Sequence, residues 1–87
     1  MKILWTPPFE RDFFTLSEAL QIRVEKTLRL LAANPRHPSL RTKKLEGAKD
    51  VWEARVSLSY RITYQASGDT LILRRVGSHD ILRKEAP

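Results

Sequence analysis

The 87-residue sequence contains no cysteine. A disulfide framework, a thiolate metal site and a cysteine nucleophile are therefore excluded. It also lacks any apolar run near the roughly 18 residues that a membrane-spanning helix needs. Its first apolar stretch is Ile3–Trp5, which ends at Thr6 and two prolines and is too short for a signal peptide. We expect a cytoplasmic protein that has no membrane partner.

The chain is too short to bury more than one modest hydrophobic core, so we expect a single domain over residues 1–87. A multidomain enzyme and a deep cofactor-binding fold are excluded. Charged residues make up 30% of the sequence, but they alternate with regularly spaced apolar residues, which argues against disorder.

Acidic residues are scarce relative to basic ones, and the imbalance is uneven. Sixteen Lys and Arg face ten Asp and Glu, which gives a net charge of +6. Residues 1–35 carry a net +1, with five basic and four acidic side chains, whereas residues 36–87 carry +5, with eleven and six. A basic half on a small domain indicates a polyanionic partner, either nucleic acid or an acidic protein segment. An ordinary basic, solvated surface is the alternative.

The first 35 residues predict a strand and a helical hairpin. Residues 2–6 read as a strand that ends at Pro7 and Pro8, and proline is favoured in the first turn of a helix. The segment Thr15–Glu18 has the form of a capping box, so we expect the second helix to begin there and to end at Asn34–Pro35. The helical stripe comprises Phe9, Phe13, Leu16, Leu20, Val24, Leu28 and Leu31.

Further along the chain the apolar period changes to two. A short basic segment (40–45) precedes two alternating runs (51–58 and 60–64) and a strongly apolar run (70–76). Short turns join these three runs, which predicts an antiparallel meander. Residues 81–87 show no clear pattern. We therefore predict an α+β fold in which an N-terminal strand and a helical hairpin pack on a twisted antiparallel β-sheet.

The alternation also predicts which side chains share a face. Glu53, Arg55 and Arg61 lie together, Lys43 or Lys44 joins them if segment 40–45 enters the sheet, and His79 follows the last strand. Such a cluster favours an anion-binding site. The face that packs on the helices is predicted to carry Trp52, Ala54, Val56, Ile62 and Tyr64. We expect Trp5 and Trp52 to be core residues and His37, in a proline-bounded loop, to be structural.

The sequence resembles the RelE/ParE superfamily of type II toxins over nearly its whole length. The segments His37–Gly47, Val51–Val56 and Tyr60–Tyr64 are similar to the family's Asn-Pro loop and Lys-Leu-x-Gly turn, its Trp-x-x-Arg strand and its Tyr-Arg-x-x-Tyr strand. The ending Val76–Asp80 is similar to the Gly-x-His-Asp ending of the histidine-bearing, YafQ-like branch. The resemblance implies a RelE-like fold.

The resemblance further implies a ribosome-dependent mRNA endoribonuclease, an mRNA interferase that inhibits translation. In the RelE-like branch a ribose 2′-hydroxyl attacks the adjacent phosphate, and side chains supply the cations, so no metal or other cofactor is implied. Arg61 matches the transition-state stabiliser, Arg55 and Lys43 match basic positions, and His79 matches the general acid or base.

Other positions depart from the family pattern or remain open. No aromatic residue follows His79, so Arg83 is the candidate for stacking on the mRNA base, and Lys44 is a further candidate for substrate binding. Glu53 either acts as a base or pairs with Arg55 or Arg61.

The implied partners are a cognate antitoxin, the ribosome and mRNA, with operator DNA bound only through the antitoxin. Two alternative functions share the fold. One is a ParE-like toxin that inhibits DNA gyrase, which does not require a histidine after the last strand. The other is a catalytically weak relative that mainly binds its antitoxin.

Overall fold

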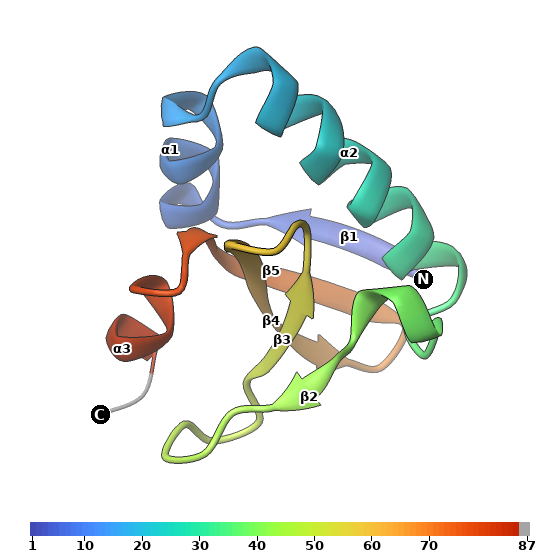
Figure 1. Ribbon diagram of the computed structural model, residues 1–87. Helices are drawn as coiled ribbons and strands as arrows, with labels where there is room; N and C mark the ends of the chain where they lie inside the picture. The colour runs from blue at the N-terminus through green and yellow to red at the C-terminus, as the bar shows by residue number, and fades with distance from the viewer. Residues whose placement is uncertain (86–87) are drawn as a thin grey trace.

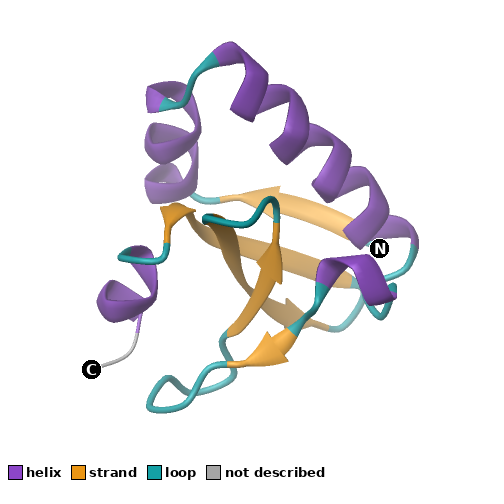
Figure 2. Ribbon diagram, viewed as in Figure 1, coloured by secondary structure: helices purple, strands orange, loops and turns teal. Residues whose placement is uncertain are grey.

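The computed structural model describes residues 1–85, without the side chain of Lys84. It has the predicted α+β architecture, in which helices α1 and α2 cover one face of a five-stranded sheet (Figures 1 and 2). The elements are β1 (Lys2–Trp5), α1 (Pro7–Thr15), α2 (Glu18–Ala33), the 3-10 helix η1 (Pro38–Leu40), β2 (Lys43–Lys44), β3 (Trp52–Arg55), β4 (Tyr60–Ser67), β5 (Thr70–Ser78) and α3 (Ile81–Glu85).

The strand order is β1-β5-β4-β3-β2. Strands β3 to β5 form the predicted antiparallel meander, and β2, whose entry into the sheet the sequence left open, pairs antiparallel with β3. β1, whose partner the sequence did not indicate, pairs in parallel with β5. The helical hairpin connects β1, at one edge of the sheet, to η1 and then to β2 at the opposite edge. None of the described helices is long and apolar enough to cross a membrane.

The helices of the hairpin begin and end at residues that cap them. The hydroxyl of Thr6 accepts a hydrogen bond from the amide of Phe9 at the start of α1. The predicted start of α2 at Thr15 is wrong, because the Thr15 hydroxyl donates to the Asp12 carbonyl at 2.6 Å within α1. Ser17 caps α2 instead. The helix ends at Asn34, as predicted.

The hydrophobic core lies between this hairpin and the sheet. Trp5 packs edge-on against Phe9 and Phe13, with ring centroids 4.9 Å apart in both pairs. Trp52 also lies at a core-facing position, but it remains 36% exposed, so our prediction of a core role is wrong for it. The core cluster comprises Phe9, Phe13, Val24, Leu28, Leu31, Leu40, Ala54, Val56, Ile62, Tyr64, Leu71, Leu73 and Val76.

A bulge interrupts β5 at Arg74. Thr63 pairs with Arg75 and Tyr64 pairs with Leu73, so Arg74 has no residue opposite it on β4. The bulge allows Leu73 and Val76, which are three residues apart, to be buried in the same core.

Asp12 from α1 is bound at this irregular point. The Arg75 side chain donates two hydrogen bonds to the carboxylate, at 2.6 and 3.0 Å, and the Val76 amide donates a third at 3.2 Å. The hydrogen bonds to Asp12 raise the pKa of the Arg75 guanidinium. The helical hairpin is therefore attached to β5 by charge as well as by apolar contacts.

Helix α3 packs against β4 and β5, in the segment for which the sequence gave no pattern. A Cβ atom on Gly77 would lie 2.7 Å from Cγ2 of the buried Ile81, so the close approach requires glycine. The carboxylate of Glu85 pairs with Arg74, which also donates to Gln65 at 3.1 Å. These contacts fix the direction in which the chain leaves β5.

Candidate functional site

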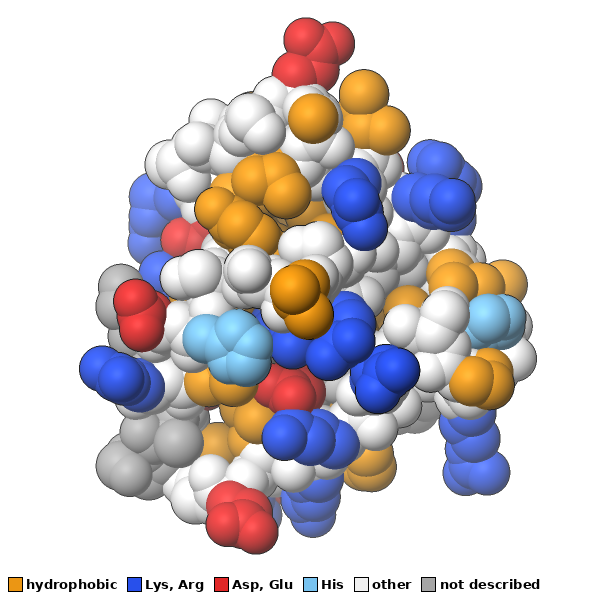
Figure 3. All heavy atoms as spheres, viewed as in Figure 1, with side chains coloured by type: hydrophobic (Ala, Val, Ile, Leu, Met, Phe, Trp, Pro, Cys, Tyr) orange, Lys and Arg blue, Asp and Glu red, His pale blue; other side chains and the backbone are white. Residues whose placement is uncertain are grey.

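The candidate site is a hollow of about 320 Å³ between the 41–43 segment, β3, β4 and the end of β5. Four of the six candidate residues line it, namely His79, Arg61, Arg55 and Lys43. Figure 3 shows a histidine, several basic side chains and an acidic side chain gathered on this face. The full lining comprises Arg41, Lys43, Glu53, Arg55, Arg61, His79 and Leu82.

His79 lies immediately after β5, at the point where the chain turns into α3. Its side chain is exposed, and its carbonyl accepts a hydrogen bond from the Leu82 amide at 3.1 Å. No hydrogen bond joins the side chains of His79 and Asp80, both of which the structure describes. Its place in the lining follows from its backbone position between β5 and α3.

Arg61 is the most deeply buried cation of the hollow, although the sequence predicted a solvent-facing side chain. It is 6% exposed, and its Nη1 donates to the carbonyls of Ser57, Leu58 and Tyr60 at 2.7, 3.1 and 3.0 Å. Burial lowers the pKa of this guanidinium, and the nearby charge of Arg55 lowers it further. Arg61 therefore holds the β3–β4 turn closed while it lines the hollow.

Arg55 lies directly opposite Arg61 in the strand register. Like charges in such a pair repel each other across the ladder. The Nε atom of Arg55 is buried and has no hydrogen-bond partner among the described residues. Arranging two guanidinium groups in this way costs stability, and an anion bound between them would relieve the repulsion.

We therefore expect Arg55→Met to stabilise the protein while weakening anion binding. The unfolding free energy should rise by up to about 1 kcal/mol, because the substitution removes the cross-strand repulsion. Denaturant unfolding in a buffer without polyvalent anions measures this change. Arg29→Met, at an exposed position of α2, is the matched control and should leave stability unchanged. If the Arg55→Met protein is less stable than the wild type, repulsion between Arg55 and Arg61 does not destabilise the fold.

Glu53 is the carboxylate of the hollow. It is 5% exposed, and its Oε1 lies 3.5 Å from Nζ of Lys43, the residue opposite it on β2. The sequence had left pairing with Arg55 or Arg61 as one option, and the ion pair is made with Lys43 instead. The second carboxylate oxygen, Oε2, is buried without a hydrogen-bond partner in the described part of the chain.

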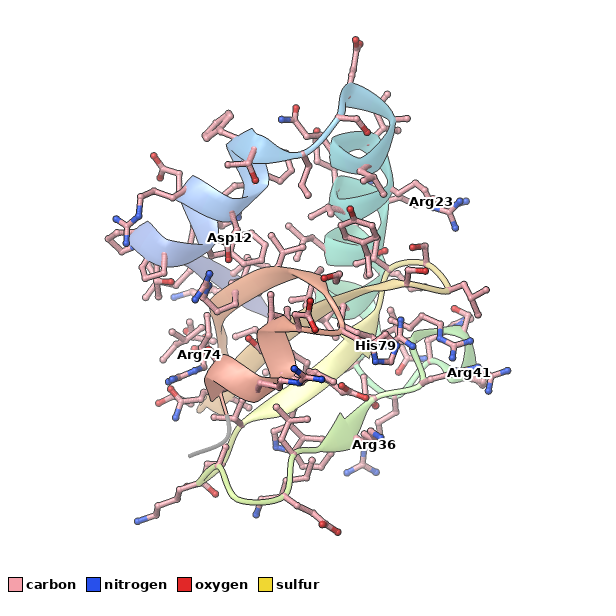
Figure 4. The ribbon with its side chains drawn as sticks, turned by 60° about the vertical axis from the view of Figure 1, so that its left-hand side comes forward. Asp12, Arg23, Arg36, Arg41, Arg74 and His79 are labelled. Atoms are coloured by element: carbon pink, nitrogen blue, oxygen red, sulfur yellow. The ribbon has the colours of Figure 1, made fainter. Side chains whose placement is uncertain are left out.

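Two of the candidate residues lie away from the hollow, and one residue that sequence reasoning missed lies in it. Lys44 alternates to the other side of β2 and pairs with Asp50 at 3.6 Å. Arg83 is exposed on α3 and is not part of the lining. Arg41 joins the hollow because it has a left-handed backbone with φ of 46°, which nothing in the sequence indicates for an arginine. Figure 4 shows Arg41 beside His79.

A larger hollow of about 550 Å³ lies next to the first, between α2, η1 and the β3–β4 turn. Arg55 lines both hollows, and α2 adds Arg23 and Lys26 to the second. Figure 4 shows Arg23 projecting from α2 on the same side as Arg41. The basic surface therefore continues beyond the candidate site.

His37, in the loop before β2, caps the 3-10 helix η1 with its side chain. Nδ1 of His37 accepts a hydrogen bond from the Ser39 amide at 3.2 Å and lies 2.8 Å from its hydroxyl. The expectation that His37 is structural is confirmed.

The hollow combines the groups that bind and transform a phosphate ester. Four cations face one carboxylate, so a bound phosphate would be met by net positive charge. His79 supplies an imidazole, the side chain that most often transfers protons in catalysis. Because Arg61 and Glu53 are held in place before any ligand binds, little reorganisation is needed on binding.

Comparisons with known proteins agree with this fold. The family model described as the ParE toxin of type II toxin-antitoxin systems, parDE, matches residues 3–82. No curated protein sequence matches significantly. Among solved structures, YafQ from Escherichia coli has a TM-score of 0.78 and 19% identity, with 93% of this chain and 96% of that chain covered.

Two further structures extend the comparison. The RelB-RelE antitoxin-toxin complex from Methanococcus jannaschii gives a TM-score of 0.75 at 22% identity, covering 97% of this chain and 99% of the other. A copper-bound mutant toxin from Helicobacter pylori gives 0.70 at 27%, covering 94% and 98%. With a family model that spans most of its length and a fold shared with these toxins, the chain belongs to the ParE toxin family of type II toxin-antitoxin systems, within the RelE/ParE superfamily.

Proposed function

We propose that this toxin is a ribosome-dependent mRNA endoribonuclease of the histidine-bearing, YafQ-like branch. The observation that carries the proposal is the convergence of His79, Arg55 and Arg61 on one hollow. Inhibition of DNA gyrase requires no acid–base group beside paired arginines, whereas cleavage of a phosphodiester requires both.

The 2′-hydroxyl of the ribose gives up its proton to water as its oxygen attacks the adjacent phosphorus, and the bond between phosphorus and the 5′-oxygen breaks. Arg55 and Arg61 stabilise the additional negative charge of the phosphorane, and Lys43 and Arg41 hold the flanking phosphates. His79 donates a proton to the leaving 5′-oxygen. The ribosome holds the message so that the attacking and leaving oxygens are in line with phosphorus.

The basic surface also supports a cognate antitoxin as the second partner. RelE-like toxins are known in complexes with antitoxins, as in the RelB-RelE structure and in the DinJ-YafQ complex from Escherichia coli. We propose that an acidic segment of the antitoxin covers the hollow and thereby blocks the message. Operator DNA is then bound through the antitoxin, and the toxin acts in the cytoplasm.

Induction of the toxin in bacterial cells tests the proposal. We expect incorporation of labelled amino acids to stop within minutes and mRNA to be cut within reading frames, while plasmid supercoiling is unchanged. Continued protein synthesis together with loss of supercoiling would contradict the proposal and would favour a gyrase inhibitor. Coexpression of the antitoxin should restore protein synthesis.

A further inference from the structure

Two consecutive arginines at the bulge of β5 bind carboxylates on two different helices. The Arg75 side chain binds Asp12 of α1, whereas Nε of Arg74 binds the carboxylate of Glu85, the last residue of α3. Figure 4 shows Arg74 next to the ribbon of α3. The proposed reaction does not use the Arg74–Glu85 pair, because neither residue lines the hollow that contains His79.

The Arg74–Glu85 pair differs from an ordinary surface ion pair in its burial. The Glu85 side chain is 5% exposed, whereas the partners of the Lys2–Asp69 pair are 79% and 73% exposed. A carboxylate that has lost its water needs a charged donor, so Glu85 stays buried only while Arg74 binds it. Nη1 of Arg74 also donates to Oε1 of Gln65 on β4 at 3.1 Å. The pair therefore connects the end of α3 to two strands of the sheet.

The placement of α3 affects two residues of the hollow. His79 precedes α3 by two positions, Leu82 belongs to its first turn, and both line the hollow. The Leu82 amide donates to the His79 carbonyl at 3.1 Å, and the Arg83 amide donates to the Asp80 carbonyl at 3.2 Å. Because these hydrogen bonds join the turn to the helix, a movement of α3 is transmitted to the backbone of His79.

Helix α3 is attached to the sheet at both of its ends. At its start the buried Ile81 packs closely against Gly77, and at its end Glu85 binds Arg74. A helix of five residues is not stable by itself, so its position depends on these contacts. Without the ion pair, α3 can pivot about Ile81, because the contact at one end alone does not fix its direction.

We propose that Arg74 and Glu85 are positioning residues for His79, an inference that rests on the proposed function. The His79 side chain is exposed, so few contacts immobilise it, and a shift of its backbone carries the imidazole with it. Donation of a proton to the leaving 5′-oxygen requires the imidazole within hydrogen-bond distance of that oxygen. Loss of the ion pair therefore displaces the acid while every group of the hollow is still present.

The test compares Glu85→Ala with wild type, using the full chain, purified ribosomes and a defined message. We expect kcat to fall by about 10-fold, because the acid is misplaced, and KM to be unchanged, because no lining residue is altered. Asp69→Ala removes an exposed ion pair at the turn between β4 and β5 and is the matched control, which should behave as wild type. A wild-type kcat for Glu85→Ala overturns the inference.

A sulfur atom at the 5′-bridging position of the message separates a positioning role from a purely structural one. A thiolate leaves without protonation, so Glu85→Ala should cleave this substrate as fast as the wild type. A defect of Glu85→Ala that persists on the sulfur substrate shows that the ion pair supports the fold and does not position the acid. His79→Gln should also be restored on this substrate, and its failure to recover would contradict the proposed role of His79 itself.

Amide hydrogen exchange tests the attachment of α3 without any cleavage. In Glu85→Ala the Leu82 and Arg83 amides should exchange at least about 10-fold faster than in the wild type, whereas amides of β4 should keep their rates. Equal exchange of the Leu82 and Arg83 amides in the two proteins overturns the inference. A wild-type protein that cleaves no message on the ribosome overturns the proposed function instead, and the exchange rates still decide whether the ion pair holds α3.

A milder variant keeps the inference testable if Glu85→Ala does not fold. Glu85→Gln retains the size of the side chain and a hydrogen bond to Arg74, but it removes the charge that strengthens the bond. We expect kcat to fall by about 3-fold on the normal message and not at all on the sulfur substrate. An unchanged kcat on the normal message, or an equal loss on both substrates, overturns the assignment.

Discussion

Replacing Arg61 with alanine should lower the rate of mRNA cleavage by about 10²–10³-fold and should also destabilise the protein. The rate falls because a fixed cation is removed from the developing phosphorane. The unfolding free energy should fall by about 2 kcal/mol, because Nη1 no longer binds the carbonyls of Ser57, Leu58 and Tyr60. Cleavage assays on programmed ribosomes and denaturant unfolding measure the two effects.

Arg61→Lys separates these effects. Lysine keeps the positive charge, but it cannot hold three carbonyls with the geometry of a guanidinium group. We expect it to recover part of the activity and little of the stability. Arg11→Ala, on the exposed surface of α1, is the control for loss of one positive charge. A stable Arg61→Ala protein that cleaves at the wild-type rate would remove Arg61 from both roles.

His79→Gln should reduce cleavage by 10²-fold or more, about the contribution of a positioned general acid. Glutamine has a similar size and can form hydrogen bonds, but it does not titrate. Because the side chain is exposed, we expect no change in the thermal unfolding midpoint and nearly unchanged binding to ribosomes. The comparison of kcat with binding therefore isolates the chemical step.

His79→Arg tests the competing role of phosphate binding. If the imidazole only supplied positive charge, arginine would preserve cleavage. We expect the arginine variant to be as slow as glutamine. Wild-type cleavage by His79→Gln is the outcome that excludes acid–base chemistry at this position.

The elements of the fold could be predicted because their apolar residues follow simple periods. The spacing of Phe9, Phe13, Val24 and Leu28 predicted the hairpin, and all four are buried. The bulge at Arg74 was not predicted, although Leu73 and Val76 cannot share a face of a regular strand. Parallel pairing of β1 depends on contacts distant in the sequence, which a local pattern does not contain.

The residues that form the site could be predicted more readily than the depth to which their side chains are buried. Strand alternation placed Arg55 and Arg61 on one face, and the end of β5 placed His79 near them. Alternation does not show that α3 packs beside this face or that Arg61 folds back onto the β3–β4 turn. Arg41 was missed for a related reason, because its inclusion depends on a left-handed backbone.

The most direct test of the account is to identify the ends of the mRNA fragments made by the purified toxin with and without ribosomes. The account predicts a 2′,3′-cyclic phosphate and a 5′-hydroxyl at cuts that require a ribosome on the message. Mass spectrometry of the fragments identifies both groups. Intact message on the ribosome, or fragments that carry a 5′-phosphate, would contradict attack by the 2′-hydroxyl in the hollow between Arg55, Arg61 and His79.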